Sequence, residues 1–303
     1  MLAPIVLFVY NRPWHTRKTL ESLETNALAK ESELFIFADG PKENASQEQL
    51  KKITETRKII REKNWCNNVT IVEKDANMGL ANSVIAGVTE IVNKFGKVIV
   101  LEDDLLISKN FLRYMNDALD RYENEEKVMQ ISGYMFPTKI LTKNDAFFLP
   151  FTTSWGWGTW KRAWDCFDPE MKGLETIKNN ENLQKKFDLN DSYPYYKMLL
   201  NQKSNQIDSW AIRFYLSVFL KDGLTLYPKK TLVKNIGFDG SGVHCKNGMS
   251  QEKINDSFVI ESFSDDVVMD EVAKIEIIYF FRKQNIFFKK LARIINENFR
   301  KIC

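Results

Sequence analysis

Short apolar runs alternate with longer amphipathic stretches through the first 104 residues, and this alternation restricts the possible fold more than any other feature. The apolar runs lie at residues 4–10, 33–38, 68–75 and 97–104. The stretches between them, which repeat apolar residues at helical spacing, are 14–26, 47–64 and 79–96. Short apolar runs bounded by loop residues are typical of buried parallel strands. Strands that alternate with helices form an open parallel sheet, so we predict an α/β fold.

Polar side chains follow each of the four predicted strands. They belong to the segments Asn11–Arg12, Asp39–Gly40, Asp75–Asn77 and Glu102–Asp104. In an open α/β sheet, ligands bind beyond the carboxyl ends of the strands. We therefore expect these side chains to meet at one edge of the sheet and to form the functional site there.

Three consecutive acids, Glu102, Asp103 and Asp104, close the fourth predicted strand. Like charges repel strongly where the dielectric constant is low, so this arrangement requires either a neutralising cation or contact with water. A solvated strand end is the simpler explanation. Oxygen ligands at such a strand end also suit Mg²⁺ or Mn²⁺, which keep several waters and bind substrate phosphates. The three acids are therefore a candidate metal site.

Beyond residue 110 the alternation becomes irregular. We predict a helix at 110–125, a strand at 127–136 and an apolar helix at 209–220. Between the last two lies a sequence rich in tryptophan and glycine, residues 151–168, which we predict to be a loop. The second half therefore contains fewer regular elements than the first.

Charge and cysteine content exclude several classes of protein. The net charge of +3 does not suggest a broad nucleic-acid-binding face. Four widely spaced cysteines and two histidines form no structural zinc motif, and free thiols indicate a reducing compartment. The apolar run at 4–10 is far shorter than the roughly 20 residues needed to span a bilayer, and no basic region precedes it. We expect a cytoplasmic protein without a signal peptide.

A series of motifs resembles the GT-A glycosyltransferases. In chain order the motifs are LFVYNRP at 7–13, FADG at 37–40, NMGLANS at 77–83, VLEDDLLISKNF at 100–111, SWGWGTW at 154–160, and DSWAIRFYL at 208–216 with the Pro, Asn and Gly residues that follow it. They are most similar to motifs of the inverting N-acetylglucosaminyltransferases that begin complex N-glycan branches, and of bacterial family 2-like sugar transferases. The resemblance covers residues 4–244.

This resemblance implies a GT-A, Rossmann-like open sheet, mostly parallel and flanked by helices. It places a nucleotide-sugar-binding half at residues 1–107 and an acceptor-binding and catalytic half at 108–270. Residues 271–303 remain as a basic amphipathic C-terminal helix.

The resemblance also assigns the contacts to donor and metal. Asp104 would hold Mn²⁺ or Mg²⁺ against the donor diphosphate, and Glu102 and Asp103 would orient the ribose, the sugar or a metal-bound water. Arg12 would pair with the diphosphate, because its guanidinium fork suits phosphate oxygens; a surface salt bridge is the alternative. Asp39 would accept a hydrogen bond from the uracil ring, although Asp-Gly-Pro is also a good turn by itself.

Asn77 and Gly79 open the predicted helix at 79–96. The free N–H groups at the start of a helix can bind an anionic or polar ligand, here the nucleotide sugar. The alternative is a simple cap followed by a flexible glycine.

Catalytic and acceptor-binding roles fall in the second half. Asp208 would be the base that takes the proton from the acceptor hydroxyl, beside an aromatic wall that shields it from water; the alternative is an N-cap of the helix that follows. Trp155, Trp157 and Trp210 would pack on the C–H faces of acceptor sugars, or else belong to a buried aromatic cluster. His244 would be a second metal ligand or a structural histidine.

The C-terminal sequence predicts a basic amphipathic helix. Its apolar arc comprises Phe280, Phe281, Phe287, Phe288, Leu291, Ile294, Ile295 and Phe299, with lysines and arginines opposite. Such a helix could lie on an anionic membrane surface and bring the enzyme to a lipid-linked acceptor. It could equally dock on the domain or on a second subunit.

Together these observations predict a metal-dependent, inverting glycosyltransferase. It would move a hexosyl or N-acetylhexosaminyl group from a UDP-sugar to a glycan or lipid-linked glycan in bacterial surface polysaccharide synthesis. The alternative is a non-catalytic protein that binds carbohydrate or a nucleotide sugar.

Overall fold

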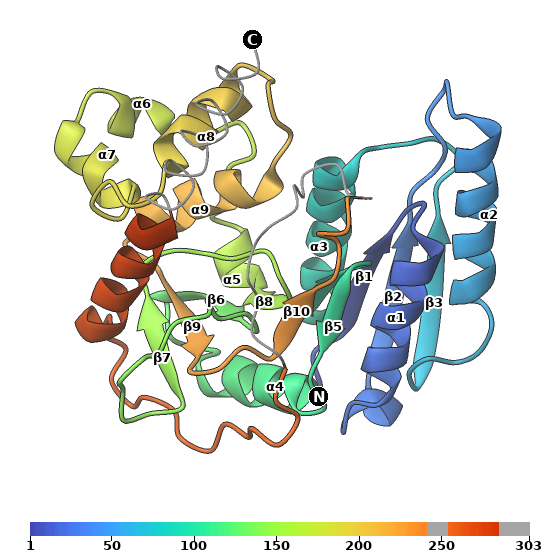
Figure 1. The fold of residues 1–303 in the computed structure, drawn as a ribbon, viewed down its shortest axis with the longest axis horizontal. Helices are drawn as coiled ribbons and strands as arrows, with labels where there is room; N and C mark the ends of the chain where they lie inside the picture. The colour runs from blue at the N-terminus through green and yellow to red at the C-terminus, as the bar shows by residue number, and fades with distance from the viewer. Residues whose placement is uncertain (241–253, 285–303) are drawn as a thin grey trace, which may run out of the picture.

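The computed structural model describes residues 1–240 and 254–284. An eight-stranded sheet forms its centre, with helices on both faces (Figure 1). The strands are β1 (Ile5–Val9), β2 (Glu33–Ala38), β3 (Asn68–Glu73), β4 (Lys97–Glu102), β5 (Leu105–Ile107), β6 (Val128–Ser132), β7 (Ala146–Leu149), β8 (Trp157–Trp160), β9 (Leu224–Pro228) and β10 (Val233–Asn235). The helices are α1 (Pro13–Glu24), the 3₁₀ turn η1 (Ala29–Glu31), α2 (Gln47–Ile60), α3 (Leu80–Phe95), α4 (Phe111–Arg121), α5 (Lys161–Trp164), α6 (Leu174–Lys178), α7 (Glu181–Phe187), α8 (Tyr195–Lys203) and α9 (Trp210–Leu220).

The strand order confirms the predicted mostly parallel sheet. It runs β3-β2-β1-β4-β8-β6-β9-β7, and the pairs among β3, β2, β1 and β4 are all parallel. Strand β8 is antiparallel to both of its neighbours, and β7 is antiparallel to β9. A small antiparallel sheet of β10 and β5 lies beyond the end of β4. Since β4 pairs with β8, the two predicted halves of the chain share one sheet.

Two apolar cores cover the two faces of the sheet, because successive side chains of a strand point to opposite faces. In β1, Ile5 and Leu7 join the core that contains α1, α2 and α4, whereas Val6 and Phe8 join the core that contains α3. This alternation explains the continuous apolar runs of the sequence, since strands covered on both sides need apolar side chains at every position.

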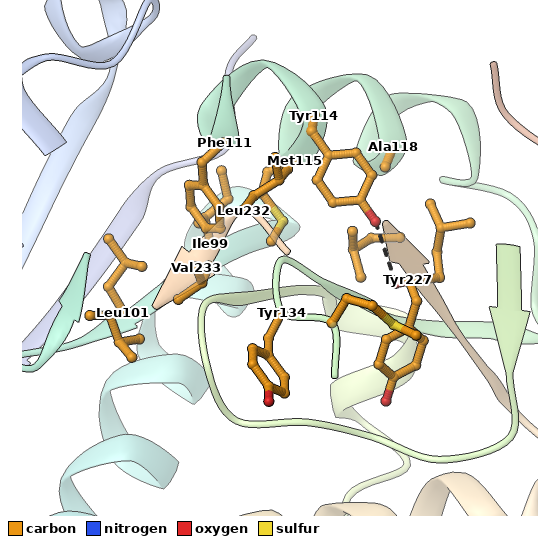
Figure 2. Close-up of a cluster of buried hydrophobic side chains, with 14 of the residues drawn as sticks. Ile99, Leu101, Phe111, Tyr114, Met115, Ala118, Tyr134, Tyr227, Leu232 and Val233 are labelled. Carbon is orange, nitrogen blue, oxygen red and sulfur yellow. Dashed lines mark hydrogen bonds between the residues drawn. The ribbon is translucent and has the colours of Figure 1, made fainter. Parts of the chain in front are cut away.

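Helix α4 packs across the sheet through the residues drawn in Figure 2. Phe111 and Met115 are fully buried, and Ile99 of β4 belongs to the same core. The hydroxyl of Tyr114 donates to the main-chain oxygen of Leu226, at 3.4 Å. This contact ties α4 to β9 in the second half of the sheet.

The prediction of a loop at 151–168 was wrong in part. Residues 157–160 form β8, a central strand between β4 and β6, and the short helix α5 follows it. Trp157 and Trp160 are buried, and Gly158 lies so close to the main-chain oxygen of Val98 (3.2 Å from an added Cβ) that a side chain would crowd β4. In this strand the tryptophan side chains are therefore buried in the core, and glycine lies where the neighbouring strand leaves no room for a side chain.

The described C-terminal residues belong to the body of the protein. Residues 254–270 run across α4 and β7, and residues 271–284 form a helix (red in Figure 1). Ala273, Ile277 and Phe281 are buried against the body and Phe280 is partly buried. Of the two alternatives for the predicted amphipathic helix, docking on the domain is the one observed at Phe280 and Phe281.

Residues 285–303, which carry the rest of the predicted arc, lie outside the described residues. Within 1–240 and 254–284, no helix combines the length and apolarity needed to cross a bilayer.

Candidate functional site

The predicted site residues of the first half meet beyond the carboxyl ends of β1, β2 and β4. Strand β1 ends at Val9 and α1 begins at Pro13, whose fixed φ and missing N–H suit the first position of a helix. Arg12 is therefore held between strand and helix, where it faces the acids that follow β4.

Arg12 forms an incomplete ion pair with Asp104. Its Nη1 lies 3.0 Å from Asp104 Oδ2 and 3.6 Å from Asp103 Oδ1. Three buried polar atoms of the pair, Arg12 Nε, Arg12 Nη2 and Asp104 Oδ1, have no hydrogen-bond partner among the described residues. Unpaired buried polar groups are costly and are rare in native proteins. The cluster thus offers two cationic N–H groups and a carboxylate oxygen to a ligand.

The other two acids are held in a low-dielectric setting. Burial raises the pKa of Glu102 to about 8, and the charges of Asp104 and Asp103 add to this effect. The charge of Arg12 and, to a smaller extent, the side chain of Trp210 lower the pKa of Glu102. Burial raises the pKa of Asp103 to about 7, with the charge of Arg12 opposing it. Without a cation, the folded protein therefore holds protons on these carboxyls at a higher pH than an exposed carboxyl would.

Residues 235–237 cover the ion pair from the side of β10. The N–H of Ile236 donates to the main-chain oxygen of Asp104 (2.8 Å), and the N–H of Gly237 donates to Asn235 Oδ1 (2.7 Å). A Cβ on Gly237 would overlap Asp104 Oδ2 and lie 2.6 Å from Arg12 Nη2. Gly237 is therefore required by the close approach of main chain to the ion pair, a role that its place in the sequence motif did not reveal.

His15 and Asp239 extend the charged cluster, and sequence reasoning missed both. His15 Nε2 lies 3.0 Å from Asp239 Oδ2. Burial lowers the pKa of His15, the charge of Arg12 lowers it further, and Asp239 opposes both. The available signal was the spacing of Arg12 and His15, since a residue that precedes a helix and one in its first turn, three positions later, lie on the same side.

Asp39 holds the loop that begins α3. Its Oδ1 accepts from the N–H groups of Gly40 (2.9 Å) and Met78 (2.8 Å). Its Oδ2 accepts from Asn77 Nδ2 (2.8 Å) and the N–H of Gly79 (3.1 Å). A carboxylate has about four lone-pair sites, so these four bonds use them all. Asp39 therefore joins the end of β2 to the start of α3.

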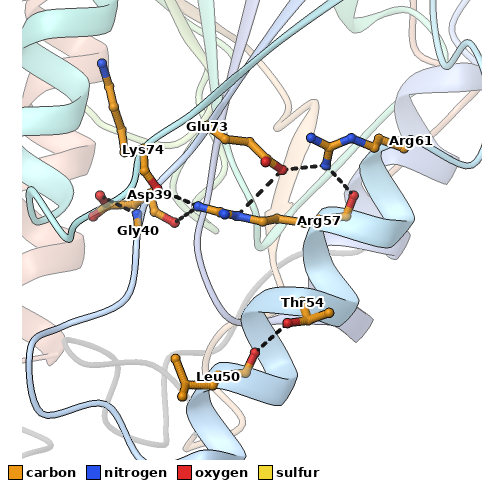
Figure 3. Close-up of polar contacts among 8 residues, drawn as sticks. All are labelled: Asp39, Gly40, Leu50, Thr54, Arg57, Arg61, Glu73 and Lys74. Atoms are coloured by element: carbon orange, nitrogen blue, oxygen red, sulfur yellow. Dashed lines mark hydrogen bonds and ion pairs between the residues drawn. The ribbon is translucent and has the colours of Figure 1, made fainter.

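An arginine supports the same loop from the outer side (Figure 3). Arg57 Nη2 donates to the main-chain oxygen of Lys74 (2.6 Å) and lies 3.5 Å from that of Asp39. Glu73 pairs with both Arg57 and Arg61. The ends of β2 and β3 are thus fixed to each other through α2.

Asp208 lies opposite the start of α3. Its Oδ2 is 3.8 Å from the position of a Cβ on Gly79, which has a φ of 79°, and its Oδ1 pairs with Arg213 Nη2 at 3.1 Å. The structure thus brings the predicted base next to a residue of the predicted donor site.

Two expectations about Asp208 are corrected. Ser209, not Asp208, caps α9, because the Ser209 hydroxyl accepts from the N–H of Ile212. The side chain of Asp208 is 57% exposed, so no aromatic wall shields it from water in this structure.

The three tryptophans predicted to bind acceptor differ in position. Trp157 and Trp210 are buried and stack on each other, with ring centroids 4.7 Å apart, and neither is among the residues that line the cavity described next. Trp157 belongs to β8 and Trp210 is the first residue of α9, which explains why both lie inside. Trp155 is only partly buried and lines a cavity of about 210 Å³ together with the first turn of α9. Of the three, only Trp155 is placed to contact an acceptor.

A metal bound here would have few ligands from the protein. Among the described residues, no three His, Cys, Asp or Glu side chains converge as a ready-made metal site. His244 lies outside the described residues. The unpartnered Asp104 Oδ1 fits Mg²⁺ or Mn²⁺, which often take only one or two protein carboxylates and complete their shell with water and substrate phosphate.

Three solved structures resemble this fold at low sequence identity. Residues 1–349 of TarS from S. aureus are 15% identical, with a TM-score of 0.43, over 77% of this chain and 60% of that one. UDP-glucose pyrophosphorylase in complex with UDP-glucose is 13% identical, with a TM-score of 0.39, over 77% and 92% of the two chains. Mouse xyloside xylosyltransferase 1 is 12% identical, with a TM-score of 0.37, over 73% and 82%.

The match to a sequence family is more decisive. No curated protein matches the sequence. The model of glycosyl transferase family 2, however, matches residues 5–190, which include β1 to β4, the three acids and the tryptophan-containing strand. The finer likeness to N-acetylglucosaminyltransferases stays a prediction. The protein is a glycosyltransferase with a GT-A-like fold, and it belongs to glycosyl transferase family 2.

Proposed function

We propose that this glycosyltransferase moves a sugar from a UDP-sugar to a glycan acceptor with inversion, with the help of a divalent cation. The proposal depends mainly on the unpartnered atoms of Arg12 and Asp104, which together can accept a cation and an anion. A metal–diphosphate complex supplies both a cation for the carboxylate of Asp104 and an anion for the guanidinium of Arg12. UDP is the proposed nucleotide because of the sequence resemblance, and the complex of UDP-glucose pyrophosphorylase with UDP-glucose agrees with it.

On this proposal, each group at the strand ends has a separate task. Arg12 Nε and Nη2 would donate to diphosphate oxygens, since a guanidinium fork matches that geometry. Asp104 Oδ1 would bind Mn²⁺ or Mg²⁺, and Glu102 and Asp103 would orient the ribose, the sugar or a metal-bound water. The cation would stabilise the charge that develops on the departing nucleoside diphosphate.

Asp208 is the proposed catalytic base. An inverting transfer requires a base such as a carboxylate, which takes the proton from the acceptor hydroxyl. At the same time the oxygen of that hydroxyl forms the new bond to the anomeric carbon, and the bond from this carbon to the nucleoside diphosphate breaks. Arg213 holds Oδ1, so Oδ2 remains on the side of Gly79 and is available for the proton. The exposure of Asp208 in this structure leaves room for an acceptor at that oxygen.

The proposed acceptor is a growing surface glycan, free or lipid-linked. The exposed side of the C-terminal helix carries Val272, Ile275 and Tyr279, and the sequence after it has five basic residues and one acidic residue at 285–303. These features support contact with an anionic membrane. Substitution of serine for both Ile275 and Tyr279 should reduce co-sedimentation with vesicles of anionic phospholipid; unchanged binding would refute this contact.

Release of UDP tests the proposal directly. A panel of UDP-sugars should include one that gives UDP in the presence of Mn²⁺ and a glycan acceptor, and NMR of the product should show an inverted anomeric centre. If UDP-sugars bind but no UDP is released with any acceptor, the alternative of a non-catalytic nucleotide-sugar-binding protein is favoured.

A further inference from the structure

The cavity beside the proposed base has walls that no part of the donor site uses. Its volume is about 210 Å³, and Ser209, Ala211 and Ile212 of the first turn of α9 form one side. Trp155 and Tyr134 form another side, with their ring centroids 4.5 Å apart. Ser209 follows Asp208 directly, so the wall of the cavity begins one residue along the chain from the proposed base.

The C-terminal helix supplies a further wall through Phe281. The ring of Phe281 lies 5.0 Å from that of Phe136 and 4.9 Å from that of Tyr193, centroid to centroid, and both partners line the cavity. Phe281 is 3% exposed. The wall therefore comes from a segment that is distant in sequence from every other part of the site.

Polar contacts at both ends fix this helix to the body. At its start, Asp270 Oδ1 accepts from the N–H of Ala273 (2.9 Å), and the N–H of Asp270 donates to the main-chain oxygen of Phe148 in β7 (3.0 Å). Near its end, Arg282 Nη2 donates to the main-chain oxygen of Asn190 (2.9 Å). Phe281 is thus held in place as part of the cavity.

The chemistry of the lining indicates which molecule would fit. Aromatic rings pack on the C–H faces of sugars, and the hydroxyl-bearing residues Thr152, Thr153 and Ser154 also line the cavity. Every lining residue among those described is uncharged. The volume is below the roughly 300–1,000 Å³ of pockets for drug-sized ligands, so a group the size of one sugar ring is favoured.

We propose that this cavity binds the acceptor's terminal sugar as a neutral ring, and that Phe281 of the C-terminal helix is one of its specificity-determining walls. The inference rests on the proposed function, since it takes Asp208 as the base. A ring without charge is expected because a uronate in this cavity would lose its hydration without gaining an ionic partner.

Two variants of one helix test the role of Phe281. Phe281→Leu keeps an apolar side chain in the core but removes the ring face, whereas Tyr279→Leu removes a ring and its hydroxyl on the exposed side of the helix, which does not line the cavity. We expect Phe281→Leu to raise the KM for a neutral glycoside acceptor roughly 2- to 10-fold, as for the loss of one aromatic contact. Tyr279→Leu should leave that KM unchanged. The affinity for UDP with Mn²⁺, measured by calorimetry, should match the parent in both variants.

A paired ligand comparison tests the chemical class without turnover. Saturation-transfer NMR with UDP and diamagnetic Mg²⁺ present should show methyl hexosides in contact with the protein and the matching methyl hexuronides much less so, and Phe281→Leu should weaken the hexoside signal. Equal signals from hexosides and hexuronides, or a parental acceptor KM and signal in Phe281→Leu, would overturn the inference. Failure of the parent protein to bind UDP would instead count against the proposed function.

Discussion

Asp39→Asn separates two roles of a residue that the sequence assigned to the uracil ring. In the structure its carboxylate accepts four N–H groups, from Gly40, Asn77, Met78 and Gly79. An asparagine presents one NH₂ where a carboxylate oxygen stood, so whichever way it turns, two donors lose their acceptor. The two remaining hydrogen bonds become weaker, because their acceptor is then a neutral amide oxygen instead of a carboxylate.

The magnitude follows from the burial of the site. Asp39 is 8% exposed, so water can replace the lost bonds only in part. An unsatisfied buried donor costs about 1–3 kcal/mol, so two donors give a loss of at most roughly 2–6 kcal/mol in the free energy of unfolding. The loss should concentrate in the loop that begins α3. Denaturant unfolding should measure it, and amide hydrogen exchange should show faster exchange at Met78 and Gly79.

Base selectivity supplies the control for Asp39. If the carboxylate only holds the loop, Asp39→Asn should weaken UDP and CDP to a similar extent. If it reads the uracil N3–H, the substitution should shift the ratio of UDP to CDP affinity while the free energy of unfolding barely changes. The second result would refute the reasoning from the four hydrogen bonds. Asn77→Ala, which removes only one of the four donors, is a matched variant and should give a smaller loss.

Three further predictions concern the ion cluster and the base. Asp208→Asn should lower turnover about 10²–10⁴-fold while UDP-sugar binding and melting temperature stay near parental values, and near-parental turnover would exclude Asp208 as the base. In the folded metal-free protein the pKa values of Glu102 (about 8) and Asp103 (about 7) are raised above those of the unfolded chain. The folded state therefore binds more protons than the unfolded state between about pH 4 and pH 8, and the free energy of unfolding should fall as pH rises through this range. A divalent cation should offset this loss, and the rise in melting temperature with Mn²⁺ should be larger at pH 8 than at pH 6; an equal rise at both would contradict the assignment. Gly237→Ala should displace the carboxylate of Asp104 and abolish binding of UDP with Mn²⁺ at nearly parental α-helix content, as measured by calorimetry and circular dichroism.

The first half of the fold could be predicted because its signals are local. Strands covered on both faces require apolar runs, and helices such as α2 and α3 show a clear apolar face with a capping box at Ser46 or a left-handed glycine at Gly96. The predicted helix at 79–96 and the observed α3 differ by one residue at each end. The convergence of Arg12 with Asp104 followed from the rule that parallel strands end at one edge.

The second half depends on contacts that no local pattern reveals. The sequence around Trp157 has the glycines of a loop, but tertiary packing makes it a central strand, because only glycine fits beside β4 and the gaps are filled by indole rings. Likewise the periodicity of the C-terminal sequence predicted a helix, and a helix is observed at residues 271–284. The pattern could not tell that Phe281 lines a cavity together with the first turn of α9.

Calorimetric titration of UDP, with and without Mn²⁺, into the parent protein and Asp104→Ala tests the central claim that Arg12 and Asp104 hold a metal–diphosphate complex. The account predicts that Mn²⁺ strengthens UDP binding to the parent protein and has no such effect on Asp104→Ala, because the carboxylate oxygen that would ligate the cation is gone. If Asp104→Ala binds UDP with Mn²⁺ as tightly as the parent protein does, the proposed metal site is wrong.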